Sequence, residues 1–238
     1  MMKQLLSILD PRTLYTSEQL KPTVLMILAA LAPTVHRYFG SIEFARLTFS
    51  SLSDFESCVY MFGAAFLVMG LLPVAIIHFV FRESLRDYGL TVGNWRIGLP
   101  VVVLLFVLIA GFLLYPSSHT EEMRSFYPFD KGAGDSMLSF IRLEVSRGLL
   151  FYTAWEFFFR GFLLFGLRKS FGDWAAICMQ TIPSCLWHIG MPTGEIFGSL
   201  AAGILFGIMA IRSRSILWVF LLHFMIGVGT DLFIVITG

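Results

Sequence analysis

Long apolar segments alternate with short polar ones along most of this chain. An α-helix needs about 20 mostly apolar residues to cross the hydrocarbon core of a membrane. Seven segments approach or exceed that length, and they cover residues 22–38, 58–81, 97–115, 148–168, 174–190, 195–211 and 215–237. The pattern predicts an all-α fold, a polytopic membrane bundle of about seven transmembrane helices, organised as one transmembrane domain over residues 1–238.

The fourth apolar segment is preceded by an amphipathic stretch, "MLSFIRLEVSRGLL", at residues 137–150. Charged residues alternate there with apolar ones, which is typical of a helix that lies at a membrane surface. The stretch also fits a direct extension of the fourth segment. Both interpretations stay open on the sequence.

Composition agrees with the membrane assignment. Hydrophobic residues make up 57% of the chain and charged residues 14%, whereas soluble domains carry roughly 25% charged residues. The net charge of +1 gives no reason to expect binding to nucleic acid. We therefore expect membrane lipid as a partner and no nucleic acid.

The basic residues predict the orientation, because cytoplasmic loops carry an excess of Lys and Arg. With the N-terminus inside, ten of them face the cytoplasm: Lys3, Arg12, Lys21, Arg82, Arg86, Arg96, Arg168, Lys169, Arg212 and Arg214. Four face outward: Arg37, Arg46, Arg124 and Lys131. Residues 1–15 lack the apolar core of a secretory signal. We expect an integral protein of a bacterial inner (plasma) membrane with a cytoplasmic N-terminus.

A few ionisable residues interrupt the apolar segments. Those at membrane depth are Glu156, Arg160, His188, His223 and Asp231, with Glu195 at the edge of the sixth segment. Such residues are costly in a bilayer and usually face a protein interior or a wet cavity. At a rise of ~1.5 Å per residue, three helices place these groups within one slab roughly 12 Å thick. This favours one shared polar site over scattered structural contacts.

Each residue also has a purely structural interpretation. Glu156 and Arg160 lie four apart, on one helix face, where they can simply neutralise each other. A single histidine in a span often serves as an interhelical hydrogen bond, and Asp231 can be an acid at the membrane surface. Three such explanations at one depth are less economical than one site.

Four short motifs resemble a known family. They are "LRDYGL", "WEFFFRG", "LWHIGMPTGE" and "LLHFMIGVGTD". Together they resemble the CAAX protease and bacteriocin-processing (CPBP, or Abi) family of intramembrane endopeptidases, in a variant with Trp-Glu in the first motif. The resemblance covers residues 82–236, and the catalytic motifs lie in 152–236.

The resemblance implies hydrolysis of a peptide bond in a membrane-associated protein or peptide by a water that glutamate and histidine activate. It assigns catalytic roles to Glu156, His188 and His223 and a supporting role to Arg160, and the variant's late aspartate matches Asp231. Glu195 is a further supporting candidate by its position seven residues beyond His188. Glu195 is the reserve candidate for the base. The family acts without an obligatory metal, so no cofactor is expected. Zinc stays open, because carboxylates and imidazoles are acceptable zinc ligands.

Three positions depart from the family pattern. Trp155 stands where the first motif usually has its first glutamate, Ser184 replaces a phenylalanine of the second motif, and Gly227 replaces the asparagine of the third. Two alternatives stay open: a catalytically inactive membrane scaffold, which such departures would leave, and an ion-coupled transporter, in which the buried polar cluster would couple ions. No internal repeat of the kind common in transporters is visible.

The enzyme hypothesis makes structural predictions. Glu156, His188 and His223 should line one cavity, and Arg160 should orient Glu156. Asp231 should accept the second ring proton of His188 and so fix its tautomer.

Overall fold

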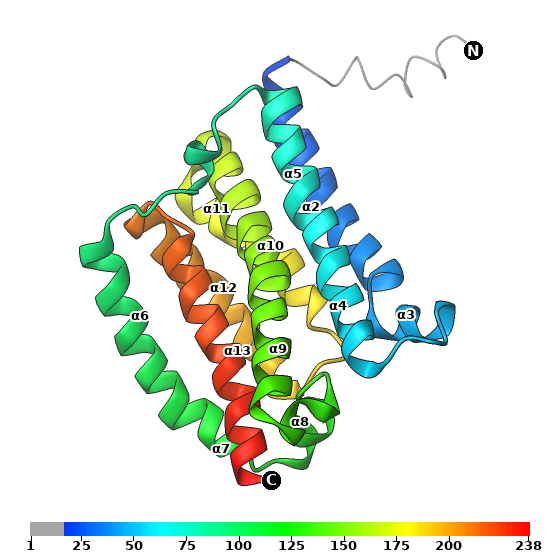
Figure 1. Cartoon of the computed structure of the whole chain (residues 1–238). Helices are drawn as coiled ribbons and strands as arrows, with labels where there is room; N and C mark the ends of the chain where they lie inside the picture. Colours follow the sequence, from blue (N-terminus) through cyan, green and yellow to red (C-terminus); the bar gives the residue numbers. More distant parts are fainter. Residues whose placement is uncertain (1–16) are drawn as a thin grey trace.

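The computed structural model describes residues 17–238, and within that range the chain is helical and contains no strand (Figure 1). The α-helices are α2 (Leu20–Phe39), α3 (Ile42–Thr48), α4 (Asp54–Ala65), α5 (Leu72–Ala75), α6 (Trp95–Ile109), α7 (Tyr115–Ser117), α8 (Glu121–Phe126), α9 (Met137–Ser146), α10 (Thr153–Glu156), α11 (Gly166–Trp187), α12 (Thr193–Ser213) and α13 (Leu217–Thr237). Lys3, Arg12 and the stretch expected to lack a signal lie outside the described residues.

Wider π-helical turns join several of these helices into longer rods. They cover Phe66–Leu71, Ile76–Phe81, Ala110–Leu114, Arg147–Tyr152 and Phe157–Phe165. Short 3-10 turns cover Ser17–Gln19, Leu85–Tyr88 and Lys131–Asp135. The prediction of an all-α membrane bundle is confirmed.

Five continuous helical runs are long and apolar enough to span a membrane: Asp54–Phe81, Trp95–Ser117, Met137–Trp187, Thr193–Ser213 and Leu217–Thr237. A sixth span results if α2 and α3, which meet at an angle of 44°, are taken together. These counts refer to residues 17–238.

The longest run, Met137–Trp187, contains both the fourth and the fifth predicted span. Its two halves meet at Gly172, where φ is 79° and ψ is 168°. Glycine adopts such a positive φ without the clash that a Cβ would cause. The amphipathic stretch at 137–150 continues directly into the following turns, so the extension is correct and the separate surface helix is wrong.

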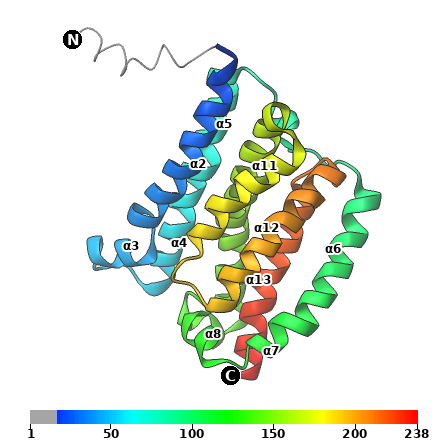
Figure 2. The same ribbon diagram turned by 180° about the vertical axis from the view of Figure 1, so that it is seen from behind.

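The two halves fold back on each other at Gly172, because Trp155 and Trp187 contact each other at a ring-centroid distance of 4.9 Å. The first half, residues 137–171, forms a central rod with the other helices around it (Figures 1 and 2). Helices α2, α4 and α5 lie on one side of it, and α12, α13 and α6 on the other. In the most apolar stretch of Met137–Trp187, 78% of the residues are buried, against 17% for Trp95–Ser117. Met137–Trp187 therefore forms the core. A Cβ at Gly203 of α12 would lie 2.6 Å from Thr181, so glycine permits the close approach of α12 to α11.

The wider turns change which residues share a face of the central rod. Four residues of an α-helix turn 400°, so side chains spaced four residues apart shift around the helix axis by roughly 40° at each step. A π turn holds more residues than an α turn and reverses this drift. Because π segments flank α10 on both sides, Tyr152, Glu156 and Arg160 stay close to one line.

Candidate active site

Glu156 and His223 form the centre of the polar site. The Nδ1 atom of His223, on α13, lies 2.5 Å from Oε1 of Glu156 at the end of α10. Glu156 is completely buried, and 20% of the His223 side chain is exposed. A carboxylate can only accept, so His223 donates from Nδ1 and its Nε2 is left as the proton acceptor of the neutral ring.

Arg160 lies one turn further along and faces the same carboxylate. Its Nη1 is 3.4 Å from Oε1 of Glu156, and its side chain is 2% exposed. The guanidinium carbon also lies 5.3 Å from the centre of the Phe206 ring, on α12. Arg160 therefore supplies the opposite charge for Glu156 in an apolar surrounding and anchors it from a neighbouring turn.

His188 enters from the end of α11, beyond Trp187. Its Nδ1 lies 2.8 Å from the backbone oxygen of Ser184, which can only accept. The ring proton is therefore on Nδ1, and Nε2 is again the unprotonated atom. The Ser184 carbonyl thus fixes the tautomer that Asp231 was predicted to fix.

Trp155 packs edge-on against His188, with ring centroids 5.6 Å apart. His188 also lies within electrostatic reach of His223 and Arg160. Trp155 itself is 1% exposed and packs against Phe159 at a centroid distance of 4.6 Å. The indole thus takes up space beside an imidazole where the family usually has a second acid.

Tyr152 is the site residue that the sequence analysis missed. Its ring centroid lies 4.6 Å from that of His223. A Cβ added to Gly227 would lie 2.1 Å from the Tyr152 hydroxyl oxygen, so that oxygen occupies the space an asparagine side chain would need. The spacing of four residues before Glu156 was the available signal, because it places Tyr152 on the same face.

Asp231 belongs to a second buried cluster and not to His188. Its Oδ2 lies 3.1 Å from Nη2 of Arg147, and that same nitrogen donates to Oε2 of Glu144 at 2.6 Å. Arg147 is 1% and Asp231 0% exposed. The predicted contact between Asp231 and His188 is wrong, and so is the alternative of an acid exposed at the membrane surface.

Glu195 has its hydrogen-bond partner outside the central pair. It accepts a hydrogen bond of 2.8 Å from the hydroxyl of Tyr127, in the loop that follows α8. Burial, followed by the nearby Glu195 charge, raises the pKa of the Tyr127 phenol well above its usual value, so Tyr127 stays a donor. This partner leaves Glu195 poorly placed as a reserve base.

Two imidazoles with free Nε2 atoms can accept a proton from water. The Glu156–His223 contact orients one ring and stabilises the imidazolium that forms on it, as a carboxylate commonly does for a functional histidine. The other carboxylate oxygen of Glu156, Oε2, is enclosed and has no hydrogen-bond partner among the described residues. Among residues 17–238, no three His, Cys, Asp or Glu side chains gather as metal ligands.

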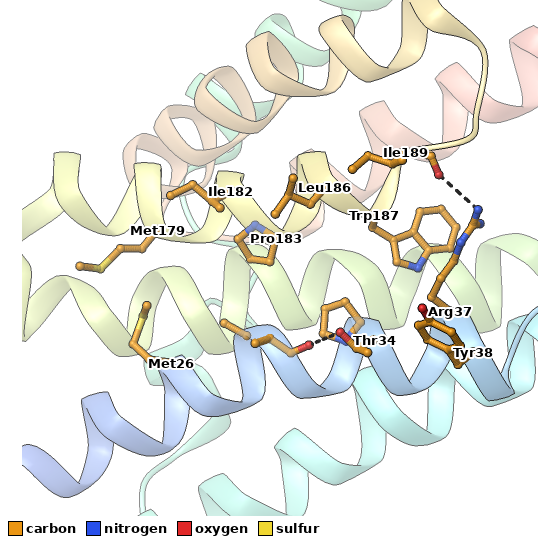
Figure 3. Close-up of a pocket in the computed structure, with 13 residues that line it drawn as sticks. Met26, Thr34, Arg37, Tyr38, Met179, Ile182, Pro183, Leu186, Trp187 and Ile189 are labelled. Atoms are coloured by element: carbon orange, nitrogen blue, oxygen red, sulfur yellow. Dashed lines mark hydrogen bonds between the residues drawn. The ribbon is translucent and has the colours of Figure 1, made fainter.

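A groove runs beside the site between α2 and α11 (Figure 3). Its volume is about 540 Å³, and apolar side chains form most of its lining, including Met26, Ile182 and Leu186. Arg37 lies at one end of it, where Nη2 donates to the Ile189 backbone oxygen at 3.2 Å.

Trp187 lies between the groove and the site. Its ring contacts Trp155 at a centroid distance of 4.9 Å and His188 at 5.8 Å, while it also lines the groove. Trp187 thus forms the wall between the groove and the imidazole of His188.

Residues 145–228 match the family model described as type II CAAX prenyl endopeptidase Rce1-like. The matched segment contains Trp155, Glu156, Arg160, His188 and His223, and it confirms the resemblance to the CPBP family. No curated protein and no solved structure matches the chain. The apolar helices indicate an integral membrane protein, and the match supports a CAAX-type intramembrane endopeptidase in general.

Proposed function

We propose that this protein hydrolyses a peptide bond in a membrane-associated protein or peptide, using a water that Glu156, His223 and His188 activate. The observation that carries the proposal is the 2.5 Å contact between Glu156 and His223 inside an apolar bundle, within the segment that matches the protease family. A buried acid–imidazole pair is expensive in this environment. A catalytic role explains why the bundle keeps this pair despite its free-energy cost, and why each histidine leaves its Nε2 without a partner.

The reaction needs a proton acceptor, and His223 fits that role best. Its Nε2 takes a proton from water as the water oxygen attacks the carbonyl carbon of the substrate. The same proton then passes to the amine nitrogen as the C–N bond breaks, which yields a carboxylic acid and an amine. His188 accepts the second hydrogen bond of the water through its own Nε2 and so aligns it.

Glu156 acts in this mechanism by orienting His223 and stabilising the imidazolium. Its Oε1 faces His223 and Arg160, and its Oε2 is enclosed. A direct role as base would require that enclosed oxygen to meet the water. Orientation through His223 needs no such rearrangement, and it keeps the reaction dependent on Glu156.

The groove between α2 and α11 supports a substrate with an apolar segment in the membrane. Its lining is apolar, Arg37 at its end suits an anionic group at the membrane surface, and Trp187 connects it to His188. The proposal includes a cytoplasmic N-terminus and residence in a bacterial inner membrane, on the distribution of Lys and Arg.

An inactive scaffold is the second candidate. The observation that favours it is the packing of Trp155, which is 1% exposed beside His188 and replaces an acid by an apolar ring. The scaffold predicts that variants of Glu156 keep every function of the protein as long as it folds.

Cleavage assays on the full chain reconstituted in lipid vesicles separate these candidates. Three labelled substrates are compared: a peptide with a prenylated CAAX end, the same peptide without the prenyl group, and a peptide precursor with a membrane anchor. We expect wild-type protein to cleave at least one of them.

Glu156→Gln should fold and lose cleavage by about 10³-fold or more, as when the carboxylate behind a catalytic histidine becomes an amide. Glu121→Gln, in the exposed first turn of α8, is the matched control and should cleave normally. Cleavage of none of the three by wild type, or equal cleavage by Glu156→Gln, would reject the enzyme and leave the scaffold or transporter.

A further inference from the structure

Tyr152 lies at the centre of the site but has no hydrogen-bond partner. Its side chain is 8% exposed, and among residues 17–238 its hydroxyl neither donates nor accepts a hydrogen bond. Other tyrosines in the bundle do use theirs: Tyr88 bonds Glu83, Tyr127 bonds Glu195 and Tyr60 bonds the Phe39 backbone oxygen. The ring is mostly buried, whereas the hydroxyl oxygen is not one of the fully enclosed unpartnered atoms, so it is open to a ligand from the site.

The position of this hydroxyl is defined by Gly227. A Cβ at residue 227 would lie 2.1 Å from the Tyr152 oxygen and 2.7 Å from its Cζ. Real atoms do not approach that closely, so the tyrosine requires glycine at this point of α13. Gly227 follows His223 by one turn, and the hydroxyl therefore lies one turn away from the catalytic imidazole, on the same side of α13.

Two contacts hold the Tyr152 ring there. It packs on His223 at a centroid distance of 4.6 Å, and the guanidinium carbon of Arg147 lies 5.6 Å from its centre. The positive charge of Arg147 draws electron density away from the phenol and so makes its O–H a stronger donor to an anion. The ring is thus fixed on one side by the proposed base and on another by a cation.

We infer that the Tyr152 hydroxyl donates the hydrogen bond that stabilises the oxyanion of the tetrahedral intermediate. When the water oxygen bonds to the carbonyl carbon, the π electrons of the carbonyl move onto its oxygen, and that oxygen accepts from the Tyr152 O–H. The phenol keeps its proton. When the C–N bond breaks, the electrons return to form the new carbonyl, and the hydrogen bond weakens again.

The inference rests on the proposed function but is independent of how Glu156 acts. It also differs from a structural role in the neighbouring cluster, because the hydroxyl makes no hydrogen bond to Arg147, Glu144 or Asp231. A structural role would reside in the ring, which Tyr152→Phe retains. A catalytic role resides in the oxygen, which Tyr152→Phe removes.

The test compares four reconstituted proteins on the peptide that wild type cleaves: wild type, Tyr152→Phe, Glu156→Gln and Tyr115→Phe. Tyr115 is half exposed, and Tyr115→Phe is the matched control for loss of a phenol oxygen. We expect Tyr152→Phe to lower kcat by about 10²–10³-fold, the usual effect of removing one oxyanion donor, with KM changed less than threefold. Its thermal stability in detergent should match that of wild type.

A second measurement uses the aldehyde analogue of the same peptide, whose hydrate mimics the tetrahedral intermediate. Its inhibition constant should rise in Tyr152→Phe by about the factor by which kcat/KM falls. Normal kcat in Tyr152→Phe, or a rise in KM alone, would overturn the inference while inactive Glu156→Gln upholds the proposed function. Normal cleavage by both variants, or none by wild type, would instead overturn the proposed function itself.

Discussion

Replacing Arg160 by methionine removes the guanidinium that faces the buried carboxylate of Glu156. Methionine keeps a long apolar side chain in the space beside Phe206, so the change is mainly one of charge. The carboxylate would then remain at 0% exposure without its cation. The perturbation therefore measures how much the central site depends on that ion pair.

The geometry sets the size of the effect. Arg160 Nη1 and Glu156 Oε1 lie 3.4 Å apart, and both side chains are at most 2% exposed. At an effective dielectric constant of ~20, two unit charges at this distance attract by about 5 kcal/mol. Removing one partner of a buried pair typically costs about 3–5 kcal/mol, because a charge is left uncompensated. We expect Arg160→Met to lower the free energy of unfolding by about 3–5 kcal/mol.

The assay is reversible unfolding in mixed detergent micelles, with the double variant Arg160→Met/Glu156→Gln completing a cycle. The double variant should be more stable than Arg160→Met alone, because it removes the orphaned charge. Arg168→Met is the control. It breaks a pair with Asp173 whose side chains are 30% and 49% exposed, and such a surface pair contributes only about 0–1 kcal/mol. A loss in Arg160→Met no larger than in Arg168→Met would refute the reasoning.

Three further predictions concern the surroundings of the site. Arg160→Lys should retain most of the stability but lower cleavage at least tenfold, measured as kcat/KM, because the planar fork that faces Glu156 is lost; full activity at equal protein level would contradict this. Glu195→Gln should cleave within about twofold of wild type, because Tyr127 already binds that side chain; loss of cleavage in a folded variant would make Glu195 the base. Ala30→Phe should fill the groove between α2 and α11 and raise KM severalfold at constant kcat, whereas an unchanged KM would place the substrate elsewhere.

The sequence predicted the spans well, because the length of an apolar run is a direct physical requirement of the bilayer. It also predicted two separate spans over 148–168 and 174–190, and the structure has two helices there that fold back on each other at Gly172. The pairing of Glu156 with His223 follows from residues that membranes exclude unless they meet a partner. For that reason the centre of the site was more predictable than its edges.

The wrong assignment of Asp231 has a geometric cause. Counting residues gives a position along each helix axis but neither its tilt nor the direction in which a side chain points. Asp231 was placed level with His188, whereas the structure pairs it with Arg147 and gives the His188 proton to a backbone oxygen. Arg147 itself was overlooked because the amphipathic stretch around it also suited a membrane surface.

The contacts between the central rod and α13 follow one register. His223 meets Glu156, Gly227 meets Tyr152 and Asp231 meets Arg147, so each step of four along α13 corresponds to a step of four or five backward along the rod. In a bilayer, polar contacts and small residues decide how helices align, because apolar side chains pack equally well against lipid.

A shift of one turn between these two helices would therefore cost all three contacts at once. It would separate Glu156 from His223, bring a larger side chain than Gly227 against the Tyr152 phenol, and leave Asp231 without Arg147. The ion pair at Asp231 and the glycine at 227 thus restrain the same sliding of α13 along the rod that the Glu156–His223 contact restrains. Even without touching the substrate, Arg147 and Asp231 hold His223 at the height where Glu156 can orient it.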